Sequence, residues 1–249
     1  MKPMIRAAML ALVIASVQAQ AHTNPAPVGP WQSAVAWQAT PSIVQDLLEL
    51  APSLDASVAT RALQAAECAL GDGQLVDRLL VVDMGMPSTE KRLWAFDLTD
   101  MKKPRLVLHD YVSHGAGSDP QATGKAQRFS NTPNSNMTSL GLYRVAEAYT
   151  GKHGGSRRLD GLTPGFNDKA RARAVVMHPA SYVGNGRAGR SHGCPAVSPQ
   201  AMAALEQVGL TDALLWIDGP DAQLARQVAS CAPGNQSQSL AQVNSKKAR

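Results

Sequence analysis

The sequence predicts a β-rich α+β domain with helices near both ends of the chain. Short apolar or alternating runs at residues 79–84, 93–98 and 105–112 are separated by turn residues, which is the pattern of a β-meander. Before these runs, the stretches 41–50 and 55–70 place their apolar residues at helical spacing. We therefore expect two N-terminal helices to pack as a layer against a sheet.

Residues 1–21 have the features of a secretory signal peptide. Two basic residues precede an apolar run over 7–17, and a small-residue site follows at 19–21. The run is too short for a comfortable membrane span, so we expect the signal to be cleaved and the mature chain to begin near Gln20 or His22. The alternative is an uncleaved anchor. This predicts an exported protein of the periplasm or cell-wall space, with no transmembrane segment after cleavage.

The charge balance is mildly basic. The formal net charge is +5, and removal of Lys2 and Arg6 with the signal would lower it to +3 (5 − 2). This excess suits an exported protein near an anionic wall or membrane surface, and it does not indicate a nucleic-acid partner. A non-enzymatic wall-binding module is one function class that such a surface would fit.

Composition divides the chain after the signal into four parts. Residues 22–40 are rich in Pro, Ala and Gln without periodicity, which predicts a flexible lead-in, and the polar, basic stretch 233–249 is expected to be a disordered tail. Between them we expect a helical N-terminal segment at 41–74 that packs on the core, followed by one larger domain at 75–232.

The remaining elements follow in order along the larger domain. A long polar stretch, 113–136, is rich in Gly, Ser, Thr, Asn and Pro, and we expect a binding loop or a lid there. Ser198 and Pro199 have the residue types of an N-cap and a first-turn proline, so they predict a helix to about Val208. The other predicted elements are strands at 139–149, 156–162, 174–177 and 211–218 and a final helix at 221–230.

The chain has three cysteines, which is an odd number for an oxidising compartment. Cys68 and Cys231 both lie in predicted helices that flank the core, so they are the natural disulfide pair. Such a bridge would leave Cys194 reduced. The alternative is that Cys68 and Cys231 are two separately buried thiols.

Cys194 lies in a glycine-rich turn 16 residues after His178, which ends the apolar run 174–177. A thiol near its free pKa is only a few per cent thiolate at neutral pH, so a reactive cysteine needs a base or backbone donors. His178 and His192 are the candidate bases, and the N–H groups of residues 192–194 could form an oxyanion site. The alternative is an inert buried cysteine with two satisfied histidines.

A zinc hydrolase is a rival interpretation of the same residues. Its ligands would be His178 and His192 with Cys194 or His114. The chain has no HExxH motif and no paired CxxC motif to support such a site. We therefore predict neither a metal nor a cofactor.

Several dispersed motifs resemble one known family. The motifs are Pro87-Ser88-Thr89-Glu90-Lys91-Arg92-Leu93-Trp94, Phe129-Ser130-Asn131-Thr132-Pro133, Ser139-Leu140-Gly141, Gly151-Lys152-His153-Gly154, Asp160-Gly161-Leu162, Met177-His178 and Gly189-Arg190-Ser191-His192-Gly193-Cys194-Pro195-Ala196. Over about residues 75–218 the chain resembles the murein L,D-transpeptidase catalytic-domain family, a branch of the YkuD-like proteins. The resemblance implies a YkuD-like mixed β-sheet or sandwich catalytic domain with flanking helices.

The resemblance also implies a chemistry. The nucleophile is expected at Cys194 and the general base at His178, while Ser191, His192 and Gly193 are expected to form the wall of an oxyanion site. Four further residues are candidates for the substrate pocket: His114, His153, Arg190 and Tyr143. The basic turn 169–173 would either hold a substrate carboxylate or be a solvated charge run.

The implied substrate is a peptidoglycan stem peptide. The cysteine would take the acyl group of a tetrapeptide stem and pass it to an amine of a second stem, which is a cell-wall cross-link. Water in place of the amine would give an L,D-carboxypeptidase, and carbapenem β-lactams are expected to acylate the same thiol.

Two prolines depart from the family patterns. The broader YkuD-like pattern has a polar residue soon after the cysteine, whereas Pro195 and Ala196 follow here, as in this branch. A glycine commonly follows the base histidine, whereas this chain has Pro179. Because proline lacks an N–H, any donor that the family uses at that position is missing.

Overall fold

The structure is a computed structural model that describes residues 41–70 and 76–231. The predicted signal peptide (1–21), lead-in (22–40) and tail (233–249) lie outside the described residues. None of the helices in the described parts of the chain is long and apolar enough to cross a membrane.

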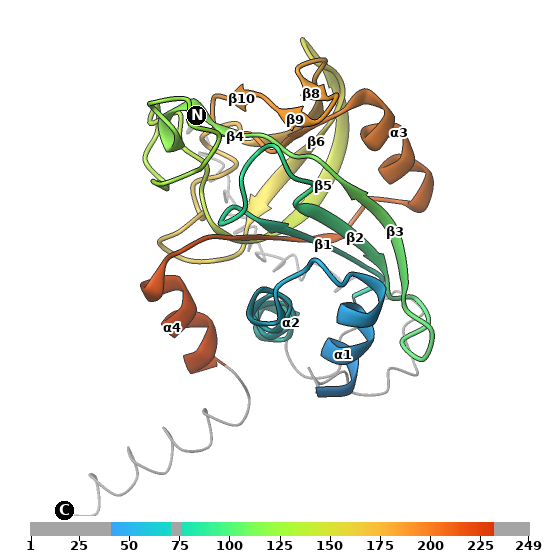
Figure 1. Cartoon of the computed structure of the whole chain (residues 1–249). Coiled ribbons are helices and arrows are strands. Elements are labelled where there is room, and N and C mark those ends of the chain that lie inside the picture. The colour runs from blue at the N-terminus through green and yellow to red at the C-terminus, as the bar shows by residue number, and fades with distance from the viewer. Residues whose placement is uncertain (1–40, 71–75, 232–249) are drawn as a thin grey trace, which may run out of the picture. The chain divides into compact units, whose positions relative to one another are not determined.

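Four α-helices and twelve strands make up the described chain (Figure 1). The helices are α1 (Pro41–Leu50), α2 (Ala56–Leu70), α3 (Pro199–Val208) and α4 (Ala222–Cys231), with a 3-10 turn η1 at Ala116–Ser118. The longer strands are β1 (Arg78–Asp83), β2 (Leu93–Asp97), β3 (Arg105–Asp110), β5 (Gly141–Gly151), β6 (Gly154–Gly161), β7 (Val176–Pro179) and β12 (Leu214–Asp218). The two-residue strands are β4 (His114–Gly115), β8 (Val183–Gly184), β9 (Arg187–Ala188), β10 (Arg190–Ser191) and β11 (Ala196–Val197).

One eight-stranded mixed sheet forms the frame, in the order β11-β7-β6-β5-β12-β1-β2-β3. The strands β1, β2 and β3 are antiparallel neighbours, so the predicted β-meander is confirmed. Within the sheet, β1 pairs in parallel with β12, with Leu79 opposite Leu214 and Val81 opposite Trp216. Both strands are buried along nearly their whole length, which explains their continuous apolar sequences.

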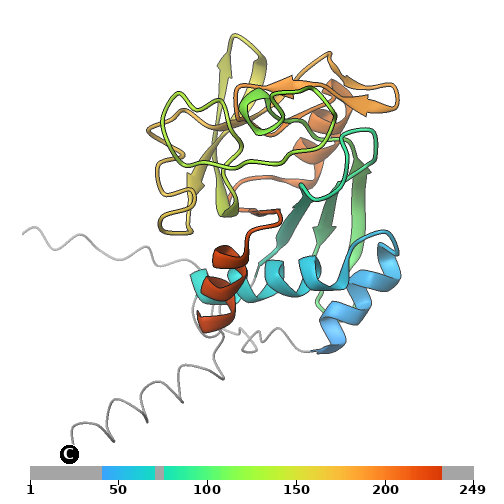
Figure 2. The same ribbon diagram turned by 60° about the vertical axis from the view of Figure 1, so that its left-hand side comes forward.

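Helices cover both faces of the sheet (Figures 1 and 2). The helix α2 packs on β1, β5 and β12, and it also contacts α1 and α4. The helix α3 contacts both β3 and β7, which lie near opposite ends of the strand order. The sheet must therefore curl so that its two ends approach the same helix. These features confirm the predicted β-rich α+β class with flanking helices.

Side chains cap two of the helix starts, and Ser198 and Pro199 do so as predicted. The Asp55 side chain accepts hydrogen bonds from the N–H groups of Ser57 and Val58 at the start of α2. Ser198 caps α3 by accepting from the Ala201 N–H at 3.0 Å, and Pro199 is the first helical residue. These caps satisfy backbone donors that a helix start leaves unpaired.

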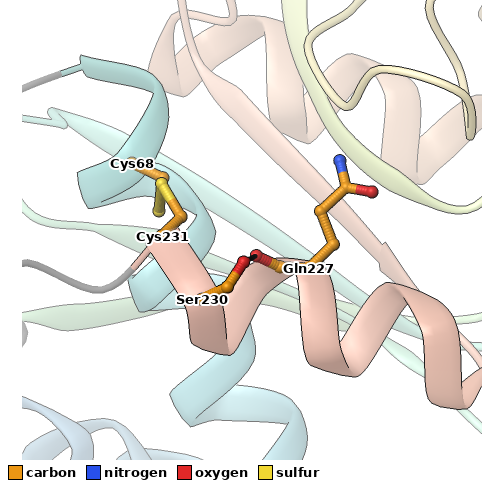
Figure 3. Close-up of a disulfide and its surroundings, with 4 residues drawn as sticks. All are labelled: Cys68, Gln227, Ser230 and Cys231. Atoms are coloured by element: carbon orange, nitrogen blue, oxygen red, sulfur yellow. Dashed lines mark hydrogen bonds between the residues drawn. A yellow bond between two sulfur atoms is a disulfide. The ribbon is translucent and has the colours of Figure 1, made fainter. Parts of the chain in front are cut away.

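A disulfide joins Cys68 at the end of α2 to Cys231 at the end of α4 (Figure 3). The two cysteines are 163 residues apart in sequence, and their Cα atoms lie 5.8 Å apart. The bridge therefore ties the first helical layer to the last helix. Cys194 is the free cysteine of the described chain.

Gly161 is a position where only glycine fits. A Cβ there would lie 1.8 Å from the carbonyl oxygen of Asn167, and that oxygen belongs to backbone that cannot swing away. We expect Gly161→Ala to lower the free energy of unfolding by about 3 kcal/mol, as overpacking does. Gly155→Ala in the same strand is the matched control, because its Cβ would meet nothing within 4 Å. Urea unfolding followed by tryptophan fluorescence checks the difference, and equal stabilities of the two variants would contradict it.

Candidate active site

Two adjacent strands bring the candidate cysteine and histidine to one end of the sheet. The strand β11 runs parallel to β7 with Ala196 opposite His178. Cys194 precedes Ala196 by two residues, and its sulfur accepts the N–H of Val176, two residues before His178, at 3.5 Å. The sulfur therefore lies beside the strand that ends in His178.

The His178 ring is oriented by the backbone. Its Nδ1 lies 3.0 Å from the carbonyl oxygen of Pro179, and because a carbonyl can only accept, Nδ1 carries the proton. This leaves Nε2 as the basic nitrogen. Residue 179 orients the His178 ring through its carbonyl oxygen, which proline also has. Proline in place of the glycine common at this position therefore leaves the contact intact.

Both candidate reacting groups are neutral in the resting protein. Burial lowers the pKa of His178, although the Pro179 hydrogen bond acts in the opposite direction. Burial raises the pKa of the Cys194 thiol, although the Val176 N–H and the cations Arg173 and Lys152 partly offset this. These pKa directions favour an uncharged thiol and an uncharged imidazole at neutral pH.

The turn before Cys194 is held by Ser191. Its hydroxyl oxygen accepts the Gly193 N–H at 3.0 Å and donates to the Cys194 carbonyl at 2.6 Å. The Gly193 N–H is therefore engaged, although it was one of the donors expected to point into an oxyanion site. The side chain of His192 is exposed to solvent. The Cys194 N–H makes no hydrogen bond within the described residues, so it is a donor available beside the sulfur.

Arg173 fastens the long loop next to Cys194. Its guanidinium donates to the carbonyl oxygens of Ser130 and Met137 and to the Ser139 hydroxyl, at 2.8 to 3.0 Å. The Met137 carbonyl in turn lies 2.8 Å from where a Cβ on Gly193 would be. The predicted loop is thus tied down as a wall of the site. The sequence showed Arg173 only as part of a basic turn, since its partners are 34 to 43 residues away and the pairing depends on the fold.

Two of the pocket candidates, Tyr143 and Arg190, hold parts of this loop in place. Tyr143 is fully buried, and its hydroxyl bonds to Ser139 at 2.7 and 2.8 Å, which places it behind the residue that Arg173 holds. Burial raises the pKa of Tyr143 to about 12. Arg190 is exposed and donates to the Asp119 carbonyl at 2.7 Å, so it anchors another part of the loop.

His114 lies in a buried polar network instead of an open pocket. Its Nδ1 is 2.8 Å from the guanidinium of Arg92, and both side chains are fully buried. Because arginine can only donate, Nδ1 accepts and the proton is on Nε2, which lies 3.4 Å from the Asp119 carboxylate without a well-aligned hydrogen bond. Burial, together with the charge of Arg92, lowers the pKa of His114 to about 4.

Acid is therefore expected to destabilise the fold through His114. Between its ordinary pKa of 6.5 and its folded pKa of about 4, the unfolded chain binds the proton more tightly. The contribution of neutral His114 to the free energy of unfolding is present above pH 6.5 and is lost as the pH falls. The loss between pH 7 and pH 4 is about 3 kcal/mol. Urea unfolding of the wild type and His114→Asn across this range checks it. Parallel pH dependences of the two proteins would contradict it.

Two residues that were not candidates for the site, Lys152 and Tyr182, also lie near it. Lys152 lies at the turn between β5 and β6, and its charge acts on both Cys194 and His178. Tyr182 packs its ring against Gly189, where a Cβ would come within 2.8 Å of it, and its hydroxyl interacts with Ser113. His153 neighbours Lys152 in the same turn and stacks on the His178 ring.

The described parts of the chain contain no set of ligands for the zinc site considered above. No group of three or more His, Cys, Asp or Glu side chains there could hold a metal ion. His114, one of the ligands considered, has its Nδ1 occupied by Arg92.

A thiol and an imidazole of fixed orientation on neighbouring segments are the kinds of side chain that cysteine-dependent acyl-transfer enzymes use. A family model described as the L,D-transpeptidase catalytic domain matches residues 50–217. The chain belongs to this family, which confirms the resemblance seen in its motifs. No curated protein matches the sequence.

Solved L,D-transpeptidases are similar to the chain at low identity. One from Mycobacterium smegmatis is 14% identical, with 57% of this chain and 59% of that chain covered and a TM-score of 0.34. LdtMt1 in complex with imipenem is 12% identical with the same two coverages and a TM-score of 0.35. One from Xylanimonas cellulosilytica is 18% identical, with 72% of this chain and 94% of that chain covered and a TM-score of 0.35. The chain thus spans 59% of the length of the first two.

Proposed function

We propose that the protein is a peptidoglycan L,D-transpeptidase that works through an acyl-enzyme on Cys194. The observation that carries the proposal is the free Cys194 thiol beside the strand that ends in His178, whose Nδ1 is held by a carbonyl. Membership of the L,D-transpeptidase catalytic domain family supports the substrate class.

The first half of the reaction forms a thioester. The Cys194 thiol gives its proton to Nε2 of His178 as the sulfur attacks the carbonyl that follows an L-configured centre of a tetrapeptide stem. The Cys194 N–H donates to the oxyanion that forms. The imidazolium then protonates the leaving D-Ala amine, the C–N bond breaks, and the acyl group stays on sulfur.

The second half transfers the acyl group. An amine of a second stem loses a proton to His178 and attacks the thioester, and the departing thiolate takes the proton back. Water in place of the amine would make the same site an L,D-carboxypeptidase. The loop that Arg173 holds passes close to Gly193, so we expect it to limit the access of water to one side of the thioester and to favour transfer.

The wall compartment is the location proposed for this activity. The substrate lies outside the cytoplasm, and the signal features of residues 1–21 agree with export. The Cys68–Cys231 disulfide supports the same compartment, because disulfides persist where the environment is oxidising.

Defined disaccharide-tetrapeptides test the proposal. Mass spectrometry is expected to find cross-linked dimers that have lost D-Ala, and tripeptides without dimers would assign the carboxypeptidase instead. Incubation with imipenem should add one carbapenem mass to the intact protein, because the strained β-lactam carbonyl acylates a thiolate. If neither a product nor an adduct is found, the proposal of an acyl-transfer enzyme is refuted and a wall-binding module remains.

A further inference from the structure

The hairpin of β5 and β6 projects beyond its neighbours in the sheet (Figure 2). The strand β12 pairs with β5 only as far as Arg144, and β7 pairs with β6 at Arg157 and Arg158. The tip, closed where Gly151 pairs with Gly154, is therefore a two-stranded arm without a strand on either side. Its two turn residues are Lys152 and His153.

His153 lies on the ring of His178. The centroids of the two imidazoles are 4.2 Å apart and their planes differ by 23°, which is a stacked arrangement. His153 is itself exposed, whereas His178 is only 3% exposed. The arm therefore ends in a side chain that covers one face of the candidate base.

One hydrogen bond does not by itself hold a histidine ring. The Nδ1 contact to the Pro179 carbonyl determines which nitrogen is free, but the torsion between Cβ and the ring has a broad energy minimum. A flat ring against one face removes that freedom. Together the in-plane hydrogen bond and the face contact would determine the direction of Nε2.

We propose that His153 is a positioning residue that clamps the His178 imidazole in its reactive orientation from the tip of the β5–β6 arm. The inference rests on the proposed function, because it assigns His178 as the base. His153 acts through His178 and takes no proton from the substrate.

The groups that face His178 are consistent with this role. Burial is the main cause that lowers the pKa of His178, and positive charge on Lys152 or His153, which approach it from the arm, acts in the same direction. Cys194 lies in the turn before β11, with its sulfur beside the strand that ends in His178. A ring stacked on His178 still leaves it free to become charged during proton transfer, since an aromatic face tolerates a cation.

Kinetics and histidine titration test the clamp. His153→Ala is expected to lower kcat for acyl transfer roughly tenfold while KM stays within about twofold, because orientation and not binding is lost. His153→Phe, which keeps a flat ring without nitrogens, is expected to recover kcat to within about threefold. Thr150→Ala on the same arm is the matched control and should match the wild type, since this side chain is exposed and makes no hydrogen bond to His178 or Cys194 within the described residues.

The NMR titration of the His178 ring, assigned with His178→Gln, is a readout that needs no turnover. Its midpoint is expected to rise in His153→Ala, because both the cover and the neighbouring charge are removed. An unchanged titration together with an unchanged kcat in His153→Ala would overturn the clamp, as would a phenylalanine variant no better than alanine. If the wild type acts on no muropeptide, the proposed function fails, and the titration alone then supports or overturns the stacking role.

Discussion

Cys194→Ala is expected to abolish both cross-linking and imipenem labelling while the protein stays folded. The sulfur is the atom that would carry the acyl group, and nothing else at this position can form a thioester. We expect turnover to fall by more than about a thousandfold, as when other enzymes lose their nucleophile. Mass spectrometry of muropeptide products and of the intact protein measures both effects.

The stability of Cys194→Ala should remain close to that of the wild type. The side chain is half-buried, and its sulfur makes one contact with the Val176 N–H and a longer one with the Ala174 carbonyl. His178→Gln is the companion variant, expected to slow acylation roughly a hundredfold or more through loss of the base. A Cys194→Ala protein that still cross-linked stems would end the mechanism, whatever the behaviour of His178→Gln.

Removal of the disulfide is expected to have the largest effect on stability. The bridge closes a loop of more than 160 residues between Cys68 and Cys231, so it strongly restricts the unfolded chain. We expect the Cys68→Ala, Cys231→Ala double variant to lose about 4 kcal/mol of unfolding free energy. Urea unfolding under non-reducing conditions measures the loss.

Reduction of the wild type supplies the control. With a reducing agent present, its stability should fall toward that of the double variant, while the double variant itself should not change. The activity per folded molecule should be nearly unaffected, because the bridge joins α2 to α4 and no residue of the candidate site lies in either helix. Equal stability of oxidised wild type and double variant would contradict the prediction.

The periodic parts of the fold could be predicted from the sequence. The helices at 41–50 and 55–70 and the meander strands were predicted within a few residues, because their apolar spacing reports which face is buried. Prediction of β12 began too early, at residue 211, because the apolar pattern does not mark where pairing with β1 starts. The short strands β4, β8, β9, β10 and β11 were not predicted, since two residues carry no periodicity.

The candidate site was predictable in part. Cys194 and His178 could be singled out because thiol and imidazole are rare, reactive groups in motifs that resemble a family. His114 and Tyr143 were also candidates for the substrate pocket, yet both are buried side chains that hold neighbouring residues in place. Sequence alone does not separate positions that a fold needs from positions that touch a substrate.

The sequence by itself determined the residue types of the site, the candidate disulfide partners and the helix and strand faces, because these follow from local chemistry and periodicity. Tertiary structure alone decided the contacts between distant segments. Three examples are the register of β7 with β11, the hydrogen bonds of Arg173 to the loop and the stack of His153 on His178, which join residues 18 to 43 positions apart. Such contacts depend on how the sheet curls and where each turn closes, which are properties of the packed chain and not of any one stretch.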